Sequence, residues 1–128
     1  MGSYKSNSSV RRHSVVAAEA IEQGKAICLD GYKYTVAGGH IGFCGFAISA
    51  VSIGETVEYE VAQNTYVQCL AGLTLTAGEE VGLDDSANVV PIAGATNTDL
   101  LVGTAGEDIT IVATALETWI NQKVDRLA

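Results

Sequence analysis

The sequence has few of the residues that cross-link a fold or carry out chemistry. It contains three cysteines, Cys28, Cys44 and Cys69, in no Cys-x-x-Cys spacing, and two histidines, His13 and His40. Three cysteines cannot all pair, so we expect buried free thiols rather than the disulfide framework of a secreted domain. Neither histidine has a second ligand or a base beside it in the sequence. We therefore expect no metal site, no cofactor and no catalytic residue, and a protein that is not an enzyme.

Basic residues are also scarce, and they are unevenly placed. Lys and Arg number 7 against 15 Asp and Glu, which gives a formal net charge of −8. Lys5, Arg11 and Arg12 give residues 1–13 a charge of +3 with no acid, so the rest of the chain carries the difference, −11. An acidic body repels phosphates and anionic lipids, so we expect neither nucleic acid nor a membrane as a partner.

Long apolar runs are missing as well. The first residues are polar and rich in serine, without the apolar stretch of a secretory signal. Residues 61–78 are uncharged, but Gln63, Asn64 and Gln68 interrupt any membrane-spanning segment there. We expect a protein that is made in a cytoplasm.

What the sequence does contain is one short phrase, written four times. A glycine is followed by a charged residue, any residue, Ile or Val, any residue, and then a large apolar residue. Glycine adopts turn conformations that other residues reach only at a steric cost, and the alternation after it has the period of a half-buried strand. The phrase predicts a turn followed by a strand at each of its four glycines, Gly24, Gly54, Gly78 and Gly106.

The composition extends this pattern to the whole chain. With 128 residues, 14 Gly and one Pro, the sequence is large enough for a single domain with its own core. Turn signals separate roughly ten short β-rich segments. We predict an all-β fold, a small glycine-cornered barrel or sandwich spanning residues 14–128. Residues 1–13, polar and basic, are predicted to be a flexible N-terminal arm.

The last segment has a different period. Apolar residues recur there at helical spacing with Trp119 beside them: Leu116, Ile120, Val124 and Leu127. Thr114 and Glu117 have the spacing of a capping box. The pattern predicts a C-terminal helix over about residues 115–127, which closes the barrel end or forms a contact between subunits.

No group of residues in the sequence predicts a specific reaction. His40 and Cys44 are four residues apart, but in a strand that spacing separates them by about 13 Å. The segment from Asp84 to Asn88 lacks the central Gly and the final Glu of a calcium loop. A small ligand-binding or enzymatic β-barrel remains the alternative hypothesis, with His40, Cys44 and Tyr59 as its candidate site.

Three segments in order carry a resemblance to a known family. They read VVAAEAIEQGKAICLDGYKYTVAG, GFCGFAISAVSIGETVEYEV and LTAGEEVGLDDSANVVPIAG. With their spacing they resemble the capsid cement, or head decoration, proteins of tailed bacteriophages. The matching motifs fall at Ala20–Leu29, Gly45–Val57 and Thr76–Asn88, and the resemblance covers roughly residues 15–113. Another phage structural component, of a tail or spike, is a further alternative.

The resemblance implies a β-tulip-like domain that forms a homotrimer on the outer surface of the virion head. Such proteins bind the major capsid protein across subunit junctions and stabilise the capsid. The family's N-terminal arm contacts the capsid, and the chemistry of the basic segment here suggests four contact residues: Tyr4, Lys5, Arg11 and Arg12. We expect Trp119 and Ile120 to form the contact between subunits.

Overall fold

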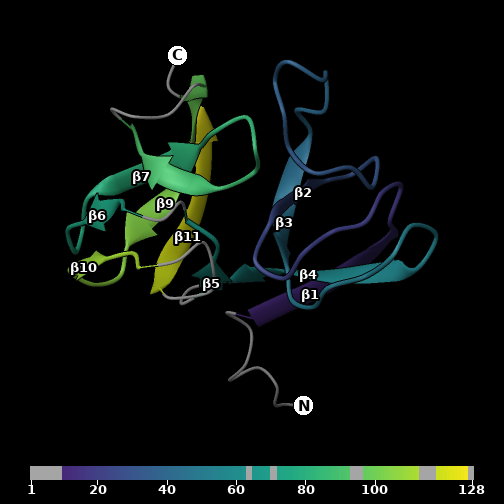
Figure 1. Cartoon of the computed structure of the whole chain (residues 1–128), viewed down its shortest axis with the longest axis horizontal. Coiled ribbons are helices and arrows are strands. Elements are labelled where there is room, and N and C mark those ends of the chain that lie inside the picture. The colour runs from purple at the N-terminus through teal and green to yellow at the C-terminus, as the bar shows by residue number, and fades with distance from the viewer. Residues whose placement is uncertain (1–9, 63–64, 70–71, 93–96, 113–117, 127–128) are drawn as a thin grey trace, which may run out of the picture.

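The computed structural model describes residues 10–62, 65–69, 72–92, 97–112 and 118–126. These residues contain strands β1 to β11 and no α-helix, which confirms the predicted all-β class. The strands form a four-stranded sheet, a five-stranded sheet and a two-stranded ribbon. Figure 1 shows the four-stranded sheet on one side of the molecule and the other two on the opposite side.

The four-stranded sheet is antiparallel and has the order β1-β4-β3-β2. Its strands are β1 (Val10–Val16), β4 (Thr56–Ala62), β3 (Phe43–Ala47) and β2 (Ala26–Cys28). The N–H of Ala18 donates to the carbonyl of Gly31 over 3.0 Å. This bond joins the segment after β2 to the segment after β1, so the two outermost strands of the sheet are drawn toward each other.

The five-stranded sheet has the order β5-β11-β9-β7-β8. Its strands are β5 (Thr65–Val67), β11 (Thr118–Arg126), β9 (Asn97–Ala105), β7 (Glu80–Leu83) and β8 (Val89–Pro91). The N–H of Val89 donates to the carbonyl of Gln68, which directly follows β5, so this sheet is also curled. The ribbon is formed by β6 (Thr74–Leu75) and β10 (Ile109–Thr110).

Strands β2 and β3 of the four-stranded sheet contribute residues to two cores, one on each face of the sheet. In β2, Ala26 and Cys28 belong to the larger core, which also contains residues of the five-stranded sheet. Ile27, between them, belongs to a smaller core formed with Val57 and other residues of the first sheet. Successive side chains of a strand point to opposite faces, so β2 supplies both cores in turn. The larger core thereby holds the two sheets together.

The predicted C-terminal helix is wrong over Thr118–Arg126, which forms β11. This strand lies between β5 and β9 and pairs with both. Thr118 and Ile120 are fully buried and Trp119 only partly, which is the alternation of a strand. Pairing on two sides overrides the helical spacing of the apolar residues. The capping-box residues Thr114 and Glu117 lie outside the described residues.

The predicted flexible arm over residues 1–13 is wrong for its last four residues. Val10–His13 belong to β1, where they pair with β4 in the register Val10 to Ala62 and His13 to Tyr59. The imidazole of His13 stacks on the Tyr59 ring at 5.6 Å between ring centres. The composition of residues 1–13 could not predict this strand, because its partner β4 lies almost fifty residues further along the chain. Residues 1–9 lie outside the described part of the chain.

Three of the four repeat glycines are turns, as predicted. Gly24, Gly54 and Gly78 have φ values of 86°, 87° and 86°, in the left-handed region that favours glycine. Gly106 has no positive φ, so its role is different. A Cβ there would lie 2.5 Å from Cδ2 of the Trp119 ring and closer still to Cε3 and Cζ3. Gly106 is required because the indole lies directly against its backbone.

Candidate functional site

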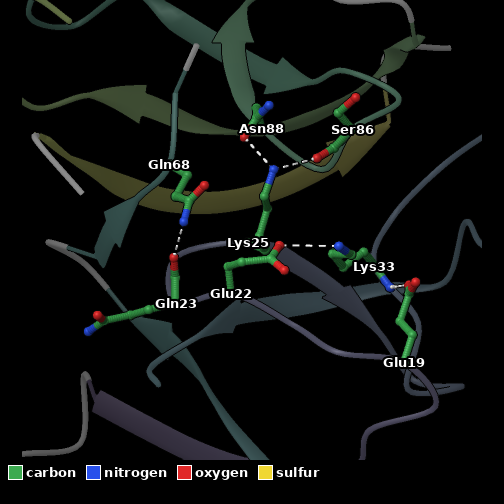
Figure 2. A network of polar contacts seen from close by, with 8 residues as sticks. All are labelled: Glu19, Glu22, Gln23, Lys25, Lys33, Gln68, Ser86 and Asn88. Atoms are coloured by element: carbon green, nitrogen blue, oxygen red, sulfur yellow. Dashed lines mark hydrogen bonds and ion pairs between the residues drawn. The ribbon is translucent and has the colours of Figure 1, made fainter. Parts of the chain in front are cut away.

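A network of polar contacts lies where the two sheets meet, centred on Lys25. Figure 2 shows the Lys25 side chain directed at the loop between β7 and β8. Its Nζ donates to the carbonyl of Ser86 over 2.9 Å and to Oδ1 of Asn88 over 2.8 Å. Close by, Nε2 of Gln68 donates to the carbonyl of Gln23 over 2.7 Å. Each of these three hydrogen bonds joins two residues that are more than forty positions apart in the chain.

An open pocket of about 320 Å³ lies beside this network. Its lining comes from both sheets and comprises Glu19, Lys25, Lys33, Tyr34, Thr35, Asp85 and Ser86. Two ammonium groups and two carboxylates balance in formal charge. The pocket therefore has neither the apolar walls of a typical small-molecule site nor a net charge that would select an ion.

The carboxylates of this pocket already accept hydrogen bonds from the chain. Glu19 accepts the backbone N–H of Lys33 over 2.8 Å. Asp85 accepts the N–H groups of Val36 and Ala37 over 3.0 and 3.3 Å, which ties the loop after β2 to the loop before β8. These contacts make both carboxylates structural, since they satisfy backbone donors that would otherwise lack partners.

A second polar cluster surrounds His40 in the loop between β2 and β3. Its Nδ1 lies 2.7 Å from Oδ2 of Asp30, and its ring stacks on Tyr32 at 4.0 Å between ring centres. Burial alone would raise the pKa of Asp30, but hydrogen bonds from His40 and from the Tyr32 N–H outweigh it, so the pKa is lowered. The cluster fixes the shape of an exposed loop, and the protonated thiol of Cys28 donates to the His40 carbonyl over 3.4 Å.

The alternative site predicted from the sequence is only partly assembled. Tyr59 and Cys44 share a hydrogen bond, whereas His40 is directed to Asp30 and Tyr32. Burial raises the pKa of the Cys44 thiol to about 11, although the Tyr59 hydroxyl opposes the shift. Burial also raises the pKa of Cys28 to about 12. Both thiols are protonated near neutral pH, and only the thiolate is an effective nucleophile.

The predicted capsid-contact residues lie at or before β1. Arg11 and Arg12 belong to this strand, at the edge of the four-stranded sheet. Tyr4 and Lys5 lie outside the described residues. The three cysteines are free, and no group of three or more His, Cys, Asp or Glu within the described part of the chain could hold a metal ion.

The two predicted contact residues of the oligomer have different environments. Ile120 is fully buried in the larger core of the same chain, and its role between subunits stays a prediction. Trp119 is partly buried against Gly106 and lies beside Tyr66 of β5, which is 57% exposed. The role of Trp119 between subunits stays a prediction.

Sequence reasoning missed Lys25 as the centre of a network. The residue is part of the first Gly-led phrase, which predicted only a turn followed by a strand. Its partners Ser86 and Asn88 lie 61 and 63 residues further along the chain. The only local signal was the series of oxygen-bearing residues from Asp84 to Asn88, which has the alternation of a cation-binding loop without its later ligands.

The fold is shared with a protein of a bacteriophage head. The chain is similar to the crystal structure of the head fiber gp8.5 N base in bacteriophage phi29, with a TM-score of 0.54 and 13% sequence identity. The likeness covers 93% of this chain and 98% of that chain, and at this identity it shows a common fold. A scan against models of protein families and a search of curated proteins gave no match. No helix of the described residues is long and apolar enough to cross a membrane.

Proposed function

We propose that this chain is a bacteriophage head decoration protein, which binds the outer surface of the capsid across junctions of the major capsid protein. The observation that carries the proposal is the fold shared with a head fiber base over 93% of the chain. The three segments that resemble cement proteins support it independently, since they were identified from residues alone. The finding that Cys28 and Cys44 are held protonated favours a structural role over an enzymatic one.

Strand β1 is the element best suited to contact a capsid subunit. It is the outermost strand of its sheet and pairs with β4 along one side. The N–H of Ala17 donates to the carbonyl of Glu55, which continues the register of β1 and β4. The backbone N–H and C=O groups of the odd-numbered residues therefore point toward β4. Ser14 and Arg12 therefore direct their backbone groups away from the sheet. At Arg12 and Ser14 no strand of the described residues pairs with this edge, and an edge of this kind accepts a further strand.

Charge would guide this contact. Arg11 and Arg12 place two cations on the outermost strand of a protein whose net charge is −8. Such a strand is attracted to acidic surface on a partner, and the attraction raises the rate of association more than the final affinity. In the homotrimer that we propose, three such strands act together. Each contact then forms at high effective concentration once the first has formed.

Proline at position 14 tests strand addition directly. Proline lacks the N–H group, and at Ser14 this group faces away from β4, so Ser14→Pro is expected to keep the sheet and to lose binding to heads. Ser14→Ala keeps the N–H and serves as the matched control. Sedimentation with purified heads measures the bound fraction. Equal binding of the two variants, both folded by circular dichroism, would exclude β1 as the docking strand.

Removal of residues 1–9 tests the arm separately. This truncation keeps β1 intact, unlike removal of residues 1–13, and it removes Tyr4 and Lys5. We expect an oligomer of unchanged mass by light scattering and a weaker attachment to heads. Full occupancy of heads by the truncated protein would rule out the arm. A monomeric full-length chain would remove the avidity mechanism without affecting strand addition.

A further inference from the structure

The loop from Asp84 to Asn88 is folded around its own first residue. Oδ1 of Asp84 accepts the N–H groups of Ser86 and Asn88 over 2.8 and 2.9 Å. The backbone of Asp84 also donates to the carbonyl of Asn88 and accepts from the N–H of Ala87. Ala87, with a φ of 63°, is the one non-glycine residue with positive φ in the described part of the chain. The resulting turn leaves the Ser86 carbonyl and Asn88 Oδ1 to face a common point.

The ammonium group of Lys25 occupies that point. It lies 2.9 Å from the Ser86 carbonyl oxygen and 2.8 Å from Asn88 Oδ1 (Figure 2). The oxygen donors at positions 84, 86 and 88 have the alternating spacing of the first ligands in a calcium loop. An ammonium offers a compact charge with three donors, and oxygens are its natural partners.

The backbone on either side of Lys25 holds the ammonium group in place. The N–H of Ala26 donates to the carbonyl of Ala87 over 3.1 Å, and the carbonyl of Gly24 accepts from Gln68 over 3.1 Å. The residue next to Lys25 and the tip of the lysine side chain are therefore both bonded to the same loop. Because the backbone is already fixed there, ordering the ammonium group costs only the rotamer entropy of the side chain.

The charge around the loop favours a cation there. Asp84 is only 8% exposed, and a buried carboxylate requires a compensating positive charge or several donors. Burial lowers the pKa of Lys25, while the carboxylates of Glu22 and Asp84 act against that shift. The lysine thus has a desolvation cost that nearby anions partly offset.

We propose that Lys25 acts as a tethered cation, which holds the loop from Asp84 to Asn88 in its folded form and so fixes the five-stranded sheet to the four-stranded sheet. The loop is then a site for a primary ammonium group that the chain fills itself. Removal of the Lys25 side chain opens this site to a free primary amine. The inference concerns the assembly of the fold and stands whether or not the chain binds a capsid.

Chemical rescue of Lys25→Ala tests the proposal. We expect the equilibrium constant for folding to fall about ten- to hundredfold, the range for hydrogen bonds to a charged group. Added propylammonium is expected to recover most of the loss, whereas tetramethylammonium, with the same charge and no N–H, is not. Amide hydrogen exchange at Ser86 and Asn88 should follow the same order. Equal effects of the two salts would overturn the proposal.

Two further variants keep the test decisive. Lys25→Met retains an unbranched apolar stem without charge or donors, so we expect it to lose stability and to speed exchange at Ser86 and Asn88. Wild-type stability in Lys25→Met would show that packing alone matters and would contradict the proposal. Lys33→Ala is the matched control, because the Lys33 ammonium pairs with the exposed Glu22 at 3.1 Å and, among the described residues, donates no hydrogen bond to the loop. It should change little and respond to neither salt.

Discussion

Replacement of Gly106 by alanine is the most direct test of the packing in the five-stranded sheet. The added Cβ would meet three ring carbons of Trp119, the nearest well inside van der Waals contact. The backbones cannot simply move apart, because the N–H of Gly106 donates to the carbonyl of Trp119 over 3.0 Å and keeps them together. Either the ring leaves its position or the two strands separate.

The size of the effect follows from overpacking and chain entropy. Forcing a methyl group into a filled site costs about 1–3 kcal/mol. Alanine restricts the unfolded chain and returns about 0.4–1 kcal/mol. We expect Gly106→Ala to lower the free energy of unfolding by about 1–2 kcal/mol, which is roughly 4–8 °C in melting temperature for a domain of this size.

Urea denaturation, followed by fluorescence and by circular dichroism, measures this loss. Trp119 is the single tryptophan of the chain, so its emission also reports displacement of the ring. Gly42→Ala is the control, since a Cβ there meets nothing within 4 Å and φ is not positive. In a Trp119→Leu background, Gly106→Ala should cost much less. Wild-type stability and emission in Gly106→Ala would refute the close contact.

Three other predictions concern turns, thiols and acid. Gly78→Ala, at a φ of 86° with open space around the Cβ, should lose about 1–2 kcal/mol by strain alone in the same urea experiment, and a loss no larger than that of Gly42→Ala would contradict this. Iodoacetamide at pH 8 should label Cys44 at least a hundredfold more slowly than a free thiol, given its pKa of about 11, and fast labelling of the native protein would contradict the burial. The lowered pKa of Asp30 means that its stabilising contribution is present above about pH 4 and is lost as pH falls through the folded-state value, so the stability difference between wild type and Asp30→Asn should shrink below pH 4.

The fold class could be predicted because its signals are local. Gly24, Gly54 and Gly78 each combine a turn that needs positive φ with an alternating segment, and both properties are visible within six residues. Gly106 has the same phrase, but glycine is needed there because the indole of Trp119, thirteen residues away, leaves no room for a Cβ. The same phrase therefore had two physical causes, and the sequence could not separate them.

The errors came from contacts between distant segments. The apolar spacing of Leu116 and Ile120 fits a helix, yet β11 pairs with β5 and β9 and takes its conformation from both. His13 looked like part of an unpaired tail, but Tyr59 stacks against it. Lys25 was predicted only as part of a turn, but its ammonium reaches a loop about sixty residues further on. Local periodicity contains no information on which partner a strand or a charge will meet.

Binding to heads is the measurement that tests the central claim most directly. Purified chain is mixed with purified heads of the phage that encodes it, from which the bound copies have been stripped, and bound protein is quantified after sedimentation. A head decoration protein saturates at a fixed ratio to the major capsid protein, and Ser14→Pro lowers that binding. Absence of saturable binding, with a chain that is folded by circular dichroism, would contradict the proposed function.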